Sequence, residues 1–108
     1  IGIKVYITEI INAIKSGYVN VTAHAREEAR DDMLVLDDIF FSVNNGEIIE
    51  DYPNDKPYPS CLIYGKMSSG DPIHSVWAYS AENRIAILIT VYRPDPDNWI
   101  NWKERMES

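Results

Sequence analysis

The fold is decided by the stretch Arg84-Ile85-Ala86-Ile87-Leu88-Ile89-Thr90-Val91-Tyr92. It is the most apolar segment of the chain, and its isoleucines alternate with residues that are themselves largely apolar. A strand that is apolar on both faces is typical of the interior of a sheet, with neighbours on either side. We therefore expect residues 84–92 to form a central strand around which the domain is built.

Three further strands are expected before it, over residues 47–52, 60–66 and 73–80. The segments between the strands are short and rich in turn-forming residues, and they read Asn54-Asp55-Lys56-Pro57, Met67-Ser68-Ser69-Gly70-Asp71 and Ala81-Glu82-Asn83. Because short turns join antiparallel neighbours, the sequence predicts a four-stranded antiparallel sheet.

Helical patterns occupy the N-terminal part of the chain. Isoleucines recur at helical spacing from Ile7 to Ile14 and predict a helix over about residues 5–16, which Gly17 would end. A second helix is expected to begin near Thr22, whose hydroxyl suits an N-cap. A third is expected over residues 36–45, ended by Gly46.

The C-terminal residues suggest a fourth helix. Asp95 can cap it, Pro96 suits its first position, and Trp99, Trp102 and Met106 would then face inward. The chain would thus form a single domain over residues 1–108, with three helices, four strands and one helix. We expect an α+β fold in which helices cover one sheet face and the other face is free to hold a site.

Composition narrows the class of protein. The chain has 108 residues, of which 45% are hydrophobic and 25% charged, as in a folded globular domain. It shows no long apolar run and no secretory signal. Its single Cys61 is expected to be a small buried apolar group and cannot form an internal disulfide. We therefore expect a cytoplasmic protein that does not enter a membrane. One cysteine and two histidines are too few for a zinc site, so no metal or other cofactor is expected.

The net charge of −7 is unevenly distributed. Residues 27–55 carry ten carboxylates against Arg30 alone, whereas residues 56–108 carry six acidic and six basic side chains. An acidic protein is a poor general binder of nucleic acid, because phosphate affinity comes largely from Lys and Arg. The acidic third fits either a solvated surface or a basic partner, and a neutral face on the sheet would still admit RNA.

Two histidines are the candidate groups for proton transfer. His24 falls in the first turn of the second helix with Glu28 one turn later, where an imidazole can act as a general base or acid, or can simply tie the helix to a neighbouring loop. His74 shares a strand face with Val76 and Ala78. It is a core histidine if that face packs on helices, and it lies in a cleft if the face is open.

Five other side chains are candidates for holding an anion. Arg26 and Arg30 are one helical turn apart and could grip a phosphate, although solvated ion pairs with the neighbouring acidic side chains are the commoner explanation of such a pattern. Thr90 and Tyr92 share a face of the last strand, and Arg93 follows. Their hydroxyls and guanidinium would suit an anion, while a tyrosine at the rim of a core is the structural alternative.

Several motifs taken together resemble one prokaryotic family, the domain of unknown function 4258. They are Thr22-Ala23-His24-Ala25-Arg26, Leu34-x-Leu36-x-Asp38-Ile39, Asn45-Gly46-Glu47-Ile48-Ile49-Glu50-Asp51-Tyr52-Pro53, Ser60-Cys61-Leu62, Pro72-Ile73-His74-x-Val76 and Ile89-Thr90-Val91-Tyr92-x-Pro94-Asp95. The chain departs from the pattern at Met33, where the family usually has glycine, and at Val35, where it usually has Ser or Thr.

The resemblance implies a fold similar to the RelE, barnase and EndoU ribonucleases. It also implies the toxin of a type II toxin–antitoxin pair, with RNA and a zinc-finger antitoxin of the MqsA type as partners. On this hypothesis the protein is a metal-independent ribonuclease similar to mRNA interferases; the alternatives are a non-catalytic protein-binding module and an inactive toxin relative. The expected catalytic residues are His24, Arg26, His74 and Tyr92, and the expected substrate-binding residues are Arg30, Thr90 and Arg93.

Overall fold

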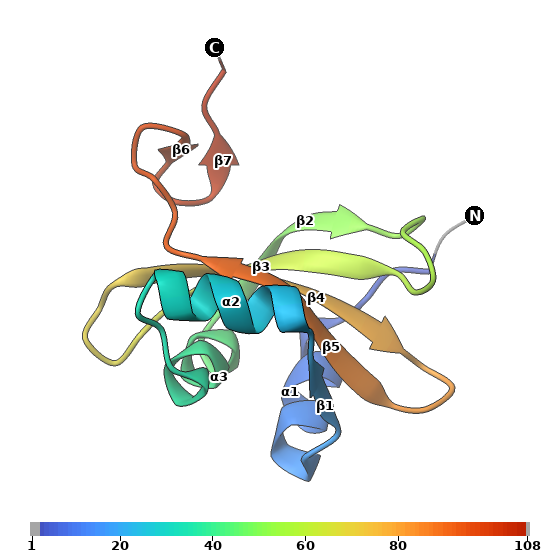
Figure 1. The fold of residues 1–108 in the computed structure, drawn as a ribbon. Coiled ribbons are helices and arrows are strands. Elements are labelled where there is room, and N and C mark those ends of the chain that lie inside the picture. The colour runs from blue at the N-terminus through green and yellow to red at the C-terminus, as the bar shows by residue number, and fades with distance from the viewer. Residues whose placement is uncertain (1–2, 108) are drawn as a thin grey trace.

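The computed structural model describes residues 3–107 and has an α+β fold (Figure 1). In chain order the elements are α1 (Ile7–Ser16), β1 (Val19–Val21), α2 (Ala23–Asp31), α3 (Leu36–Asn44), β2 (Glu47–Tyr52), β3 (Ser60–Lys66), β4 (Pro72–Ser80), β5 (Ile85–Tyr92), β6 (Trp99–Ile100) and β7 (Glu104–Arg105). Five strands form one mixed sheet in the order β1-β5-β4-β3-β2, and β6 and β7 form a separate two-stranded sheet. None of the helices within residues 3–107 is long and apolar enough to cross a membrane.

The three predicted helices are present close to their expected positions. Gly17 ends α1 in the left-handed conformation, with φ of 77°, which glycine adopts without strain. Thr22 caps α2 as expected, because its Oγ1 accepts a hydrogen bond of 3.1 Å from the backbone N–H of Ala25. Local side-chain chemistry therefore sets the boundary of α2 on which the candidate site depends.

The predicted four-stranded antiparallel sheet is wrong in one respect, because a fifth strand joins it. β1 pairs in parallel with β5 through Val19↔Ala86, Asn20↔Ile87 and Val21↔Leu88. As expected, β5 is an inner strand, and it lies between β1 and β4. A three-residue strand has too few residues to show an alternating pattern, and its partner lies more than sixty residues away.

The predicted C-terminal helix is also wrong. The Asp95 side chain accepts a hydrogen bond from the backbone N–H two residues on, so it forms a turn in place of a helix cap. Asn101 and Trp102 both have positive φ, 51° and 67°, as in the tight turns that join antiparallel strands. The result is the β6–β7 hairpin, in which Trp99 is buried while Met106 is 47% exposed.

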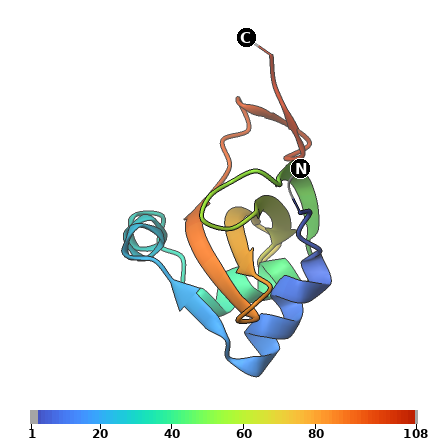
Figure 2. The same cartoon turned by 90° about the vertical axis from the view of Figure 1, so that its right-hand side faces the viewer.

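Helices α1 and α3 cover one face of the sheet, as Figures 1 and 2 show. The main core lies between these two helices and the sheet. Its fully buried members include Ile10, Ile39, Val43, Ile63, Ile73, Trp77 and Leu88. Helix α3 approaches β3 closely at Gly65, where an added Cβ would lie 1.8 Å from the carbonyl oxygen of Ser42. Helix α2 takes a different place: in Figure 2 it is seen end-on beside β5, along the edge that β1 leaves uncovered.

The other face, expected to be free, is partly covered. The β6–β7 hairpin stands on the side of the sheet opposite α1 and α3 (Figure 1), and it seats Trp99 against the ring of His74. Val76, Thr90, Ile85 and Ile87 stay partly exposed on this face. The face therefore has a covered part beneath the hairpin and an accessible part along β5.

Candidate functional site

We call the sheet face opposite α1 and α3 the distal face. Strand register assigns residues to it, because paired residues point to the same side of a sheet. On this basis β2 to β5 contribute Glu50, Tyr52, Leu62, Tyr64, His74, Val76, Ile85, Ile87, Thr90 and Tyr92. Thr90 and Tyr92 share this face as the sequence predicted, since they pair with Val76 and His74.

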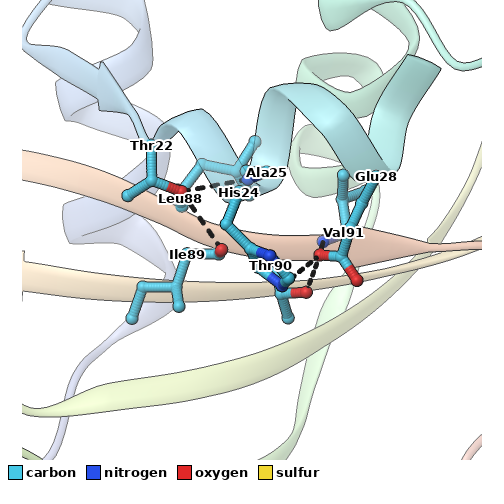
Figure 3. Close-up of polar contacts among 8 residues, drawn as sticks. All are labelled: Thr22, His24, Ala25, Glu28, Leu88, Ile89, Thr90 and Val91. Carbon is cyan, nitrogen blue, oxygen red and sulfur yellow. Dashed lines mark hydrogen bonds and ion pairs between the residues drawn. The ribbon is translucent and has the colours of Figure 1, made fainter. Parts of the chain in front are cut away.

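A chain of polar contacts joins α2 to the distal face (Figure 3). The Nε2 of His24 lies 3.2 Å from Oε1 of Glu28, and the hydroxyl of Thr90 donates a hydrogen bond to the same carboxylate oxygen. The side chain of His24 is 66% exposed, whereas that of Glu28 is 29% exposed. An accessible imidazole is thus held by a carboxylate that is itself fixed to the sheet.

Glu28 also has a structural task. Its Oε1 accepts a hydrogen bond of 3.3 Å from the backbone N–H of Val91, and the hydroxyl of Thr22 lies 3.0 Å from the carbonyl oxygen of Leu88. Both contacts fall where β1 ends and β5 has no strand partner on that side. The N-cap side chain of α2 and a side chain in its second turn therefore satisfy the strand edge, and the same contacts fix the position of His24.

His74 and Tyr92 form the second part of the site. The ring of His74 is fully buried, with Nδ1 3.1 Å from the Tyr92 hydroxyl and Nε2 2.6 Å from the carbonyl oxygen of Trp102. A carbonyl can only accept, so Nε2 carries the proton and Nδ1 accepts from Tyr92. Burial lowers the pKa of His74, and this outweighs the Trp102 carbonyl and the Glu50 carboxylate, which favour the charged ring.

Sequence reasoning missed a third group beside the hairpin. The Nε and Nη2 of Arg105 lie 2.8 and 3.1 Å from the carboxylate of Glu50, which also accepts a hydrogen bond from Tyr52. The Arg105 guanidinium lies 4.8 Å from the centre of the Trp99 ring. Burial alone would raise the pKa of Glu50, but the hydrogen bonds from Arg105 and Tyr52 outweigh it and lower the pKa; burial and Glu50 together raise the pKa of Tyr52 to about 12.

The remaining predicted anion-binding residues lie elsewhere. Arg26 and Arg30 line a hollow with Leu34 and Leu36, and among the described residues neither makes a hydrogen bond or ion pair with His24. Arg93 donates from Nε to the carbonyl oxygen of Asp32 at 2.9 Å and pairs with Asp71. The guanidinium of Arg93 is thus held by neighbouring oxygens.

Cys61 is buried, as expected, and burial raises the pKa of its thiol to about 12. A thiol that stays protonated is a poor nucleophile, so the site does not depend on it. The structure thus links four of the predicted residues through β5. His24 on α2 reaches Thr90 through Glu28, and Thr90 is followed on the same face by Tyr92, whose hydroxyl bonds His74 on β4.

Comparison with known proteins identifies one family. A model described as a domain of unknown function, DUF4258, matches residues 21–93. No curated protein and no solved structure gives a significant match. The matched segment contains His24, Glu28, His74, Thr90 and Tyr92, whereas the β6–β7 hairpin lies beyond it.

Proposed function

The chain belongs to the DUF4258 family, and from the site of this member we propose that it is a metal-independent ribonuclease and the toxin of a type II toxin–antitoxin pair. One observation carries the proposal: an exposed imidazole, His24, is oriented by a carboxylate at the margin of a sheet face that also presents Thr90 and Tyr92. A likeness to the RelE, barnase and EndoU ribonucleases and a cytoplasmic location belong to the same proposal.

The chemistry needs one base and one acid. Neutral His24 takes the proton of a ribose 2′-hydroxyl, and the oxygen attacks the adjacent phosphorus. The bond to the 5′-oxygen breaks, and a 2′,3′-cyclic phosphate remains. The leaving oxygen takes the proton of the Tyr92 hydroxyl, which breaks its hydrogen bond to Nδ1 of His74 as it donates. Tyr92 has a proton to give at neutral pH, as tyrosines ordinarily do. Burial raises its pKa, which makes proton release harder, so the proposed step depends on the position of the hydroxyl and not on its acidity. His24 then loses its proton to water, and Tyr92 regains one from water.

His74 acts through Tyr92 in this scheme. Its ring is buried and both nitrogens are engaged, so it is a positioning residue that holds the hydroxyl oxygen of Tyr92 in place. This differs from the direct catalytic role that the sequence suggested for it. Thr90 holds Glu28, which in turn holds His24. Thr90 would therefore contribute to substrate binding indirectly, by positioning His24.

Positive charge for the phosphate would come from three arginines. Arg26 and Arg30 are exposed on α2. Arg105 replaces Arg93 as the guanidinium near the acid, because its charge acts on Tyr92 and offsets part of the effect of burial on the pKa. Glu50 engages only two of the five N–H groups of Arg105, so others remain for a phosphate oxygen.

The test is cleavage of a labelled single-stranded RNA in the presence of EDTA. We expect cyclic phosphate ends, and no cleavage of the matching oligonucleotide with 2′-deoxyribose. His24→Gln should lower the rate about a hundredfold or more, because the base is lost. The control, Glu27→Gln, changes an exposed neighbour on the same helix and should leave the rate unchanged.

The proposal fails if the wild-type protein cleaves none of the cellular RNAs offered to it, or if H24Q cleaves as fast as wild type. In cells, expression of the wild-type chain should arrest growth while H24Q does not. The same experiment separates the enzyme from the inactive toxin relative, which would keep its partner and lack the arrest.

The antitoxin is the second part of the proposal. Six of the ten carboxylates of residues 27–55 are exposed and favour a basic partner, and a zinc-finger antitoxin of the MqsA type is the one we propose. Binding should weaken steeply with salt. If the chain binds such a partner but cleaves no RNA, a protein-binding module is the correct function.

A further inference from the structure

A second feature of the distal face is a hollow of about 550 Å³ at the opposite end of β5 from Tyr92. Four parts of the chain enclose it: the segment from α1 into β1, the loop between β2 and β3, the end of β4 with its turn, and the start of β5. The side chains on which the inference depends are Tyr18, Asn20, Tyr58, Asn83, Ile85 and Ile87.

We propose that this hollow binds one base of a single-stranded RNA, which makes it a recognition subsite of the ribonuclease proposed above and rests on that function. Its lining combines two tyrosines with the apolar side chains of Ile85 and Ile87, and none of the lining residues is charged. In a chain with a net charge of −7, an uncharged lining excludes salt-bridge recognition and fits a neutral aromatic ring. Tyrosine rings stack on bases of single-stranded nucleic acids.

The polar groups of the hollow match the edge of a base. Asn20 is exposed, pairs in register with Ile87 on the distal face, and its carboxamide makes no hydrogen bond within residues 3–107. Nδ2 of Asn83 lies 3.3 Å from the hydroxyl of Ser80. The side-chain oxygen of Asn83, Oδ1, accepts no hydrogen bond within residues 3–107. A carboxamide presents a donor and an acceptor side by side, which is the pair of groups that base edges offer.

The position of the hollow fits the proposed chemistry. Ile87 in the hollow and Thr90 beside His24 lie three residues apart on β5, at most about 10 Å along the strand. They face the same side because the register with β4 shifts between them, at Val76 and Trp77. A short extended RNA lying along β5 would place a base in the hollow and a nearby phosphate between His24 and Tyr92. The hollow would thus select the nucleotide next to the cleaved phosphodiester bond.

Binding can be measured without catalysis. Isotope-labelled protein is titrated with the four nucleoside 5′-monophosphates and, as the base-free control, with ribose 5-phosphate, and the NMR signals of Gly17 and the Asn20 side-chain amide are followed. We expect shifts with at least one mononucleotide and none with ribose 5-phosphate. Tyr58→Leu and Asn20→Ala should each weaken binding about tenfold, because stacking and edge contacts are lost. Asn44→Ala, in a separate hollow between α1 and α3, is the matched control and should bind as wild type.

The subsite is refuted if no mononucleotide shifts these signals, or if ribose 5-phosphate shifts them equally. With a cleavable RNA, N20A should raise KM with kcat unchanged; an unchanged KM also refutes the subsite while leaving the ribonuclease intact. Conversely, base binding by a chain that cleaves no RNA would sustain the subsite and refute the proposed function. Asn20 is exposed, so N20A should fold even if Y58L does not. The KM of N20A therefore tests the subsite independently of Y58L.

Discussion

The burial of His74 makes the stability of this protein depend on pH. The unfolded chain takes up a proton on this imidazole near its ordinary pKa of 6.5, whereas burial lowers the pKa in the folded state. Below pH 6.5 the unfolded state therefore binds more protons than the folded state, so the free energy of unfolding falls as pH falls. The full contribution is present above pH 6.5 and is lost on descending from 6.5 to the folded pKa.

One proton sets the size of the effect. The slope cannot exceed about 1.4 kcal/mol per pH unit, so the free energy of unfolding should drop by up to about 1.4 kcal/mol between pH 7.5 and 5.5. For a domain of this size that loss lowers Tm by several degrees. Glu50 does not contribute in this interval, because its pKa lies below 4.5.

The assay is urea unfolding at pH 7.5, 6.5 and 5.5 on wild type and two variants. His74→Gln keeps an amide that can donate to the Trp102 carbonyl but cannot titrate, so the variant should lose the part of the pH dependence that His74 causes. Glu27→Gln changes an exposed carboxylate on α2 that lies away from the hairpin, and it should keep the wild-type slope between pH 7.5 and 5.5. Equal pH dependence in wild type and H74Q would refute the reasoning that His74 is buried in its neutral form.

Three further predictions concern the contacts that build the site. Trp99→Ala should destabilise the protein by about 3 kcal/mol or more, because a buried ring is lost beneath the hairpin, and thermal unfolding would show it; a Tm unchanged from wild type would mean that the hairpin does not dock. Glu28→Gln should cost about 1–3 kcal/mol by weakening charged hydrogen bonds to the edge of β5, and hydrogen exchange at the amide of Val91 should speed up; unchanged protection there would contradict the contact. Gly65→Ala should cost several kcal/mol or prevent folding, because its Cβ would meet the backbone of Ser42, and a normal chemical-denaturation midpoint would show that α3 sits further away.

Much of the fold follows from local patterns. The isoleucines of α1, the hydroxyl of Thr22 before α2 and the alternation along β5 each act through neighbours within a few residues, so the positions of these elements could be predicted. The same holds for the shared face of Thr90 and Tyr92, which needs only the two-residue period of a strand.

The errors arose where distant contacts outweigh local preference. Asp95 and Pro96 carry the pattern of a helix start, yet the following segment gains more by placing Trp99 on the buried ring of His74. Strand β1 forms only because β5 offers it an edge. The ion pair between Glu50 and Arg105 joins residues 55 positions apart, and no sequence spacing predicts it.

Residue pattern alone was sufficient for the three helices, the strands from β2 to β5 and the shared strand face of Thr90 and Tyr92, because period and capping are properties of neighbouring residues. Folding in three dimensions settled which imidazole is accessible, since His24 stays exposed at the edge of β5 while the hairpin buries His74. Accessibility depends on what packs from elsewhere in the chain, and such packing leaves no mark in the local order of residues.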